Sequence, residues 1–393
     1  MRVAHLADAH LGFRQFQRLD AEGVNRREMD VALAFRRAIG QVIERKPDAI
    51  VLAGDLFHTV RPTNRAIIEA FDQLARLRHE LPGAPVVLIA GNHDTPRSLE
   101  AGSILKLMAS LGVDVVDDEE RRLSYPYLGL SVLAVPHAAL LRGRPEGGWR
   151  PDPQARHNLL LLHPEIAGLF PEVMDYGGAR VEPAELRSAE WSYVALGHYH
   201  VVHEVATRAW YAGSLEYTSP NLWGEVREEE RRGLTKGWLL ADLEAGAVER
   251  VALPPGRRIV DLPWLDAEGM TAQELDAAIA GRVGSVAGGI ADAVVRLVVL
   301  NVPRSLGHAL DHRALRVLKA EALHFQLDLR RPDPYRRAVG VGAPAGRRPA
   351  LAEVAAEYLA RRPLDADLDR ERFVALGREA LEVVERELQE GGA

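Results

Sequence analysis

Five short apolar stretches of this chain each end in side chains that commonly bind metal ions. They are residues 3–7 before Asp8 and His10, residues 49–53 before Asp55, residues 86–90 before Asn92 and His93, residues 159–162 before His163, and residues 193–196 before His198 and His200. Short stretches rich in Val, Ile and Leu are typical of buried strands whose ends carry polar functional groups. The pattern predicts an α/β protein with a two-metal hydrolytic site.

The residue types at these strand ends restrict which metals can bind. The candidate ligands comprise three oxygen donors and four imidazoles, namely Asp8, His10, Asp55, Asn92, His163, His198 and His200. This mixed oxygen and nitrogen set suits Mn, Fe or Zn, and the absence of cysteine excludes thiolate sites. Two ions roughly 3.5–4 Å apart need a bridging carboxylate, and Asp55 in Gly54-Asp55-x-x-His58 is the natural bridge.

Each motif taken alone also has a purely structural explanation. Gly91-Asn92-His93-Asp94 contains ordinary turn residues. His198 and His200 could be solvated loop histidines, and His163 could be a satisfied core histidine. The five units together supply about four ligands for each of two ions, and this concurrence favours the metal site.

The motifs, in their order along the chain, resemble those of the calcineurin-type metallophosphoesterases. The surrounding segments HLADAHLGF at 5–13, AGDLFH at 53–58 and ALGHYH at 195–200 are similar to the Mre11/SbcD nucleases that process DNA double-strand breaks. The resemblance covers residues 1 to about 255 in motif and the remainder only in architecture.

The resemblance implies a role for each candidate residue. One metal would be held by Asp8, His10, Asp55 and His200, and the second by Asp55, Asn92, His163 and His198. His93 would steady the phosphate or protonate the leaving oxygen, and His58 would orient His93; an imidazole suits such general-acid work. The sequence departs from the family in one respect, because Pro164 follows His163 where the family usually has a small residue. Proline favours an extended conformation at His163, which a ligand at a strand end tolerates.

The order of elements and breakers predicts the domain organisation. Residues 1–255 are expected to form a four-layer α/β/β/α nuclease domain of two packed sheets flanked by helices, with helices at 31–46, 64–80 and 98–111 and strand-rich sequence over 115–250. After the breaker cluster at 253–256, residues 256–331 predict a small α/β capping domain with strands at 258–265, 293–302 and 325–330 and helices at 271–283 and 312–323. By resemblance, this domain would select which DNA ends enter.

The C-terminal part predicts a contact with a partner. Residues 332–349 are rich in Pro and Gly, which predicts a linker, and the pattern of residues 350–360 and 369–389 predicts a pair of helices. The second helix carries an apolar stripe consisting of Phe373, Leu376, Ala380, Val383, Val384 and Leu388. The resemblance implies that this stripe binds a Rad50/SbcC-type ATPase; the alternative is a helix docked on its own protein.

Two further apolar stripes are candidates for self-association. They consist of Ile67, Ile68, Phe71, Leu74 and Leu77, and of Ile104, Leu105, Leu107, Met108 and Leu111. The resemblance implies a homodimer through these helices, whereas packing on the sheet explains both stripes equally well.

Composition bounds location and partners. The chain has 393 residues, no cysteine and no apolar run near the roughly 18 residues of a membrane helix, and its N-terminus lacks the pattern of a secretory signal. We therefore expect a cytoplasmic protein without a membrane contact.

The formal net charge of −7 argues against a uniformly basic DNA-binding surface. The candidate basic stretches are Arg142, Arg144, Arg150 and Arg156, residues 227–236, and Arg330, Arg331, Arg336 and Arg337, each of which could instead be a solvated loop of mixed charge.

The sequence leaves three function classes open. The first is a nuclease with two divalent ions per chain, Mn²⁺ foremost and Mg²⁺, Fe²⁺ or Zn²⁺ as alternatives, that acts as a 3′–5′ exonuclease and single-strand or hairpin endonuclease in double-strand break repair. The second is a metallophosphoesterase for a small nucleotide, phosphomonoester or phosphodiester. The third is a scaffold with a vestigial site, which the complete ligand set disfavours. A linked amphipathic helix pair favours the first class over the second.

Overall fold

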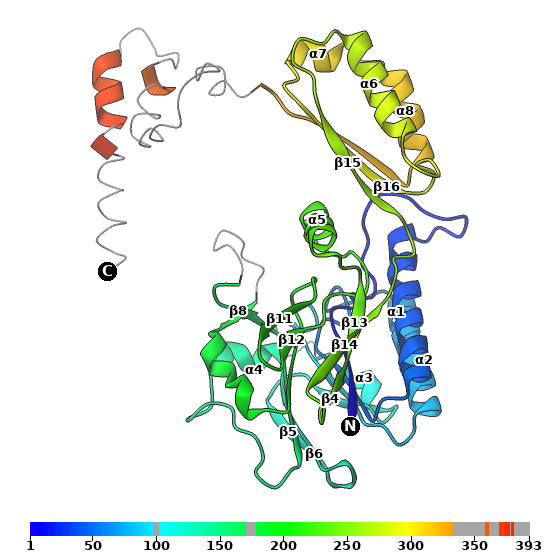
Figure 1. Ribbon diagram of the computed structural model, residues 1–393, viewed down its shortest axis with the longest axis vertical. Helices are drawn as coiled ribbons and strands as arrows, with labels where there is room; N and C mark the ends of the chain where they lie inside the picture. The colour runs from blue at the N-terminus through cyan, green and yellow to red at the C-terminus, as the bar shows by residue number, and fades with distance from the viewer. Residues whose placement is uncertain (97–101, 170–177, 333–357, 361–368, 378, 381–393) are drawn as a thin grey trace. The chain divides into compact units, whose positions relative to one another are not determined.

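The computed structural model describes residues 1–96, 102–169, 178–332, 358–360, 369–377 and 379–380 (Figure 1). The chain forms two compact units, Met1–Arg330 and Arg331–Ala393. The first unit contains two six-stranded sheets, a separate three-stranded sheet and a two-stranded sheet of β8 (Pro164–Ile166) and β9 (Ala179–Val181).

The first six-stranded sheet has the order β14-β13-β1-β2-β3-β4. Its strands are β1 (Arg2–Leu6), β2 (Ala49–Leu52), β3 (Val86–Ile89), β4 (Asp114–Val116), β13 (Gly237–Asp242) and β14 (Ala247–Ala252). β1 to β4 run parallel to one another, whereas β13 is antiparallel to β1. The carboxyl ends of β1, β2 and β3 therefore lie along one edge of this sheet.

The second six-stranded sheet has the order β11-β12-β10-β7-β6-β5. Its strands are β5 (Arg121–Tyr125), β6 (Leu130–Val135), β7 (His157–Leu162), β10 (Tyr193–Leu196), β11 (His203–Ala206) and β12 (Ala209–Tyr211). β7 pairs in parallel with both β6 and β10. All five apolar stretches that the sequence marks as buried strands are thus strands, three in the first sheet and two in the second.

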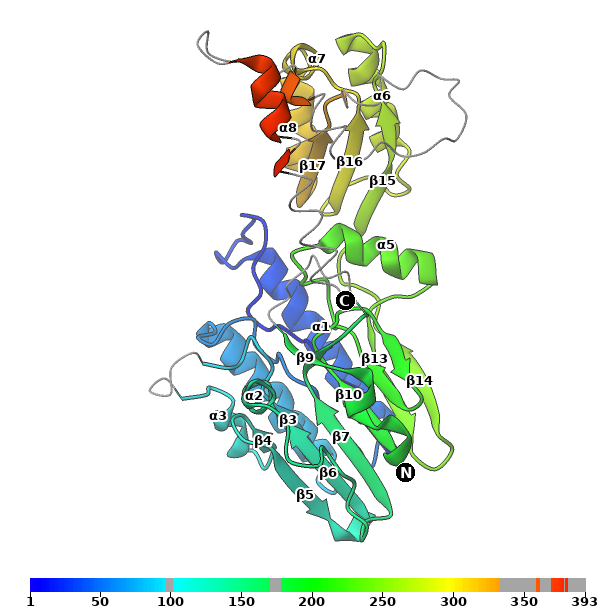
Figure 2. The same cartoon turned by 90° about the vertical axis from the view of Figure 1, so that its left-hand side faces the viewer.

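The two sheets pack face to face between outer layers of helices (Figures 1 and 2). Residues of β1 illustrate the alternation: Val3 faces a core that it shares with Leu159 and Leu161 of β7, while Ala4 faces the core that contains α1 (Arg26–Arg45) and α2 (Asn64–Glu80). The outer face of the second sheet is covered by α4 (His137–Arg142) and by the segment around β8 and β9. The predicted four-layer α/β/β/α fold is confirmed.

Several helices of the two-sheet part differ from the sequence expectation. The predicted helix at 31–46 begins earlier, at Arg26, because the Asn25 side chain caps its first turn by accepting from two backbone N–H groups. Of the predicted helix at 98–111, the described part holds only the short α3 (Lys106–Ala109), and residues 97–101 lie outside the described residues. The sequence predicted neither α4 nor α5 (Leu222–Arg232), because both lie in the stretch 115–250 that was expected to be rich in strands.

Residues 259–329 form a small α/β unit with a core of its own. A parallel sheet of β15 (Ile259–Asp266), β16 (Val294–Leu300) and β17 (His324–Leu329) packs against α6 (Ala272–Gly284), α7 (Arg304–His308) and α8 (His312–Glu321). The order of strands and helices agrees with the sequence expectation except for α7.

Charged contacts join this small α/β unit to the two-sheet part. Arg257, just before the small unit, makes two hydrogen bonds to the Asp30 carboxylate of α1 and also donates to the carbonyl of Asp292 over 2.6 Å. The Arg18 guanidinium donates to carbonyls at the end of α8 and just after it, including that of Leu323 at 3.3 Å. Arg227 of α5 pairs with Asp261 of β15 at 2.8 Å. These contacts tie the small unit to both α1 and α5.

In the second unit, the described residues are helical at 358–360, 370–377 and 379–380. The predicted helices at 350–360 and 369–389 fall only partly on described residues, and of the predicted linker only residue 332 is described. Over the described part of the chain, no helix combines the length and the apolar character needed to cross a membrane.

Candidate metal centre

The seven predicted ligands gather where the carboxyl ends of the two sheets meet. Asp8 and His10 follow β1, Asp55 follows β2 and Asn92 follows β3, while His163 directly follows β7 and His198 and His200 follow β10. Four of these residues have positive φ angles, namely Asp8 (52°), His10 (48°), Asp55 (51°) and His198 (102°). Such a conformation is strained for residues with a side chain and persists only where the surrounding structure imposes it. Four of the ten non-glycine residues with positive φ in the described part of the chain therefore lie at the site.

One group of side chains surrounds His10. Its Nε2 lies 3.0 Å from His200 Nε2 and 3.8 Å from Asp55 Oδ2. Asp8 Oδ1 lies 3.9 Å from His200 Nε2, and one ligand atom from each of Asp8, His10 and His200 falls within 4.8 Å of the others. This group could hold one metal ion.

A second group surrounds His163, which is fully buried. His163 Nε2 lies 3.3 Å from Asp55 Oδ2 and 3.0 Å from Asn92 Oδ1. His198 Nδ1 lies 3.1 Å from the same Asn92 oxygen. Asp55 Oδ2 therefore faces both groups, which is the geometry that a bridging carboxylate needs.

Two glycines beside the ligands are required by close packing. A Cβ atom at Gly54, where φ is +89°, would collide with the His163 ring. A Cβ atom at Gly197 would overlap the carbonyl oxygen of Ala53. Glycine thus precedes Asp55 and His198 because any larger residue would push the two sheets' loops apart.

Burial leaves three of the candidate ligands as neutral imidazoles. It lowers the pKa of His198 to about 3, and it lowers the pKa values of His10 and His200 well below the ordinary value. Neutral imidazole has a nitrogen lone pair available, which is the form that binds metal ions. At neutral pH these three rings are therefore in the form that could bind a cation.

The pKa values of Asp8, Asp55 and His163 depend on one another, because the three side chains are buried close together. Burial raises the pKa of Asp8 to about 7, with the His163 charge acting in the opposite direction and the Asp55 charge adding to the rise. Burial also opposes ionisation of Asp55, but the charge and hydrogen bond of His163 outweigh it and hold that pKa well below the ordinary value. Asp55 in turn raises the pKa of His163 to about 9, against the effect of burial. In the metal-free chain, a proton on His163 compensates the Asp55 charge.

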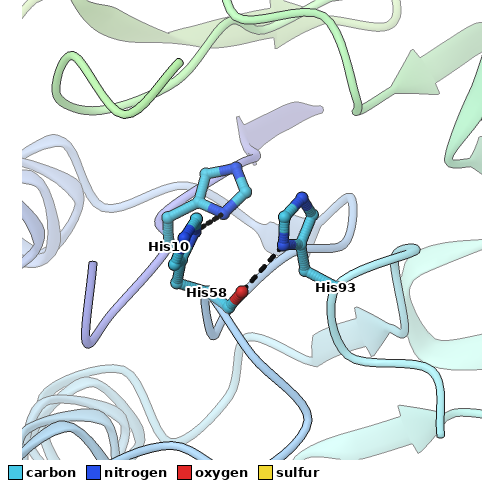
Figure 3. A group of neighbouring side chains, drawn as sticks. All are labelled: His10, His58 and His93. Atoms are coloured by element: carbon cyan, nitrogen blue, oxygen red, sulfur yellow. Dashed lines mark hydrogen bonds between the residues drawn. The ribbon is translucent and has the colours of Figure 1, made fainter. Parts of the chain in front are cut away.

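His93 and His58 lie beside the first group (Figure 3). His93 Nδ1 donates to the backbone carbonyl of His58 over 2.7 Å, and the His93 backbone N–H donates to Asp55 Oδ1 over 2.9 Å. His58 Nδ1 lies 3.4 Å from His10 Nδ1, and burial lowers the pKa of His58 to about 4. Because nitrogens of His10, His58 and His93 fall within 4.8 Å of one another, these three rings are a further group that could hold a metal ion.

A cavity of about 560 Å³ opens over these side chains. His10, Asp55, His58, His93, His198 and His200 line it together with one face of α5, formed by Asn221 at its N-cap, Gly224, Glu225, Glu228 and Arg231. These positions are separated by three, one, three and three residues, and such spacings place them on one face of a helix. The unpredicted helix is therefore a wall of the site.

Asp94 is a structural residue of the site to which the sequence pattern assigned no role. Its buried carboxylate accepts from the backbone N–H groups of Leu56, Phe57 and Gly91 over 3.0–3.2 Å. It thereby joins the loop that carries Asp55 to the loop that carries Asn92. The signal was available, because Asp94 completes the Gly-Asn-His-Asp motif.

The candidate basic stretches consist mostly of paired arginines. The pairs are Arg142–Asp118, Arg144–Glu185, Arg150–Glu190, Arg156–Glu244, Arg227–Asp261, Arg232–Glu228 and Arg330–Asp328. Arg336 and Arg337 lie outside the described residues. Arg231 differs, because it lines the cavity and has no ion-pair partner among the residues that the structure describes.

Sequence comparison assigns the chain to a family. Residues 1–202 match the calcineurin-like phosphoesterase family. The chain is also similar to proteins named "DNA double-strand break repair protein Mre11" from three archaea. It is 30% identical to that of Methanopyrus kandleri over 63% of this chain and 55% of the relative, 32% to that of Sulfurisphaera tokodaii over 51% and 49%, and 31% to that of Archaeoglobus fulgidus over 61% and 57%. The chain thus spans about half the length of these curated relatives. With a match over more than half of its length and a site at the joined strand ends, this chain belongs to the calcineurin-like phosphoesterase family.

Proposed function

We propose that this protein is a two-metal phosphodiesterase that cleaves DNA in double-strand break repair. The observation that carries the proposal is the cluster of seven ligand-type side chains at the carboxyl ends of five strands, with Asp55 between two groups of imidazoles. The names of the archaeal relatives support DNA as the substrate class.

The proposed ligand sets follow the two groups of side chains. Asp8, His10, Asp55 and His200 would hold one divalent ion, and Asp55, Asn92, His163 and His198 the other. We propose Mn²⁺ for both positions, because a set of imidazoles with carboxylate and amide oxygens suits it. The His163 Nδ1–H donates to the Ala53 carbonyl over 2.6 Å, which leaves Nε2 of that ring for the metal.

When bound, the two ions supply Lewis-acid charge for the phosphoryl oxygens and a reactive water at neutral pH. The chain itself positions a proton donor. Because His93 Nδ1–H is held by the His58 carbonyl, its Nε2 is the nitrogen left to serve the substrate in the cavity. We propose that His93 steadies the phosphate and protonates the departing 3′-oxygen, with His58 as the residue that orients it.

A small nucleotide or phosphodiester remains the alternative substrate. The cavity volume of about 560 Å³ falls in the range of pockets for small ligands, roughly 300–1,000 Å³. A nucleic-acid strand, in contrast, needs contacts to phosphates beyond the scissile one. Arg231 on the α5 wall is placed to make such a contact.

The apolar stripe of the C-terminal helix supports a proposal about a protein partner. Phe373 and Leu376 lie on the described helical residues 370–377, where Leu376 is 58% exposed, while Val383, Val384 and Leu388 lie outside the described residues. We propose that this stripe binds a Rad50/SbcC-type ATPase.

We propose a homodimer through the exposed members of the other two stripes, Ile68, Phe71 and Leu107. Leu74, Leu77, Leu105 and Met108 of the same stripes are buried in the core instead.

Replacement of His93 by Ala is expected to lower the turnover of a phosphodiester by about 10²–10⁴-fold, because the proton donor is lost. Metal analysis of the purified variant should still find two ions per chain, as in the wild type. A variant that has lost one ion would instead make His93 a ligand within the group of His10, His58 and His93.

Metal binding is expected to release protons, because Asp8 and His163 have raised pKa values of about 7 and about 9 in the metal-free chain. At pH 7, Mn²⁺ should displace about one proton or more, and its affinity should rise with pH up to about 9 and fall below pH 7. Calorimetry in two buffers with different ionisation enthalpies measures the released protons. His157→Gln, outside the site, should leave the number unchanged; binding heat that is independent of the buffer would contradict the ligand assignment.

Arg231→Ala is expected to raise the KM for a single-stranded oligonucleotide roughly tenfold, because a charge-assisted contact to a phosphate is lost. Turnover of a chromogenic bis(nitrophenyl) phosphate should not change. Arg232→Ala is the matched control, because Arg232 is paired with Glu228 and does not line the cavity. Equal effects on both substrates, or turnover of the small diester with DNA left intact, would support the small-substrate alternative.

Leu376→Asp in the full chain is expected to weaken binding to the coiled-coil base of a Rad50/SbcC-type ATPase at least about tenfold, since it places a charge in an apolar interface. Ala375→Asp introduces the same charge at an exposed neighbouring position off the stripe and should bind like the wild type. Equal affinities of the two variants in a calorimetric titration would exclude the stripe as the interface.

A further inference from the structure

Behind His200, on the side away from the other candidate ligands, lies a buried charged cluster formed by Lys236, Glu225 and Glu229. The three residues are 1%, 6% and 2% exposed. Lys236 directly precedes β13, and both carboxylates project from α5, one helical turn apart. Buried charges of this kind are unfavourable unless each is paired, so their presence calls for a specific role.

Lys236 uses its ammonium group to fix the backbone of His200. Nζ donates to the His200 carbonyl over 3.0 Å and to Ser214 Oγ over 3.0 Å, and it pairs with both Glu225 and Glu229. The same carbonyl also accepts from the Ser214 backbone N–H over 3.0 Å. These donors hold the backbone at His200 in a single position.

Glu225 faces the ring of His200. Glu225 Oε1 lies 4.0 Å from His200 Nδ1, while His200 Nε2 points to the opposite side, toward His10 and Asp8. Both His200 Nδ1 and Glu225 Oε2 are buried, and neither has a hydrogen-bond partner among the residues that the structure describes. Two such atoms on facing side chains would satisfy each other after a small rotation of either group.

Glu229 offers a natural comparison within the same helix. Its Oε1 lies 3.0 Å from Lys236 Nζ, and its Oε2 accepts from the Tyr217 hydroxyl over 2.6 Å. Glu225 and Glu229 are thus both buried and both paired with Lys236, but Glu225 is the one whose carboxylate reaches the His200 ring.

We propose that Glu225 and Lys236 are positioning residues for His200, with Glu225 accepting from the His200 Nδ1–H so that Nε2 is directed to the metal, and Lys236 holding both the His200 carbonyl and the Glu225 carboxylate. A carboxylate on the far nitrogen of a ligating histidine fixes the tautomer and raises the basicity of the ring. The inference rests on the proposed role of His200 as a metal ligand.

The test compares two single substitutions that change charge but hardly change volume. Glu225→Gln leaves Lys236 paired with Glu229, and Glu229→Gln leaves it paired with Glu225, so thermal unfolding without metal should show similar losses for both variants. Mn²⁺ is then titrated into the metal-free full chain of the wild type and of each variant. Calorimetry reports the two dissociation constants, and electron paramagnetic resonance reports coupling between two neighbouring Mn²⁺ ions.

Glu225→Gln is expected to weaken one of the two Mn²⁺ sites by about tenfold or more, to leave the other site unchanged, and to diminish the signal of the coupled pair at limiting Mn²⁺. Glu229→Gln should bind both ions as the wild type does. Glu225→Asp keeps the charge but withdraws it from the ring, and it should show the same selective weakening, which provides a second variant if Glu225→Gln does not fold.

Equal Mn²⁺ affinities in Glu225→Gln and the wild type would overturn the positioning role, as would equal losses in the Glu225→Gln and Glu229→Gln variants, because the cluster would then act only on stability. A wild-type chain that binds no Mn²⁺ would overturn the two-metal proposal itself, and the positioning role with it. The failure of either proposal is therefore recognisable.

Discussion

The burial of two carboxylates, Asp8 and Asp55, among imidazoles is the constraint on which the rest of the site depends. Two like charges removed from water are unfavourable unless cations or protons compensate them. In the metal-free chain, the proton on His163 supplies part of that compensation, which is why its pKa rises while that of Asp55 falls. A cation of higher charge would replace this proton, and the arrangement is accordingly suited to metal binding.

Holding these groups together requires two sheets rather than one. The oxygen donors come from the first sheet, at the ends of β1, β2 and β3, whereas three of the four imidazoles come from β7 and β10 of the second. Close approach of the two sets of loops depends on small residues, as at Gly54 and Gly197, and on positive φ angles at four of the ligand positions. The strain in these loops is balanced by the extensive core between the sheets.

α5 connects the site to the small α/β unit of residues 259–329. One face of α5 lines the cavity with Glu225, Glu228 and Arg231, and Glu225 extends to the His200 ring. From the same helix, Trp223 donates to Gln326 of β17 over 2.9 Å, and Arg227 pairs with Asp261 of β15. The helix that forms one wall of the cavity therefore also contacts two strands of the small unit.

The sequence by itself determined the five strands that end in candidate ligands, the layered fold and the candidate ligands, because short apolar runs followed by Gly, Asp, Asn or His are local patterns. It also located α2 and, apart from α7, the order of elements in the small unit, although it missed the Asn25 cap of α1. Only the tertiary structure placed Glu225 and Lys236 next to His200. Contacts between residues 25 or more positions apart produce no periodic pattern in the sequence from which they could be predicted. The tertiary structure also showed that most of the arginines considered as DNA contacts form ion pairs within the protein, whereas Arg231 lines the cavity. The sequence did not predict this, because the partner of a surface charge is set by the fold and not by its neighbours in the chain.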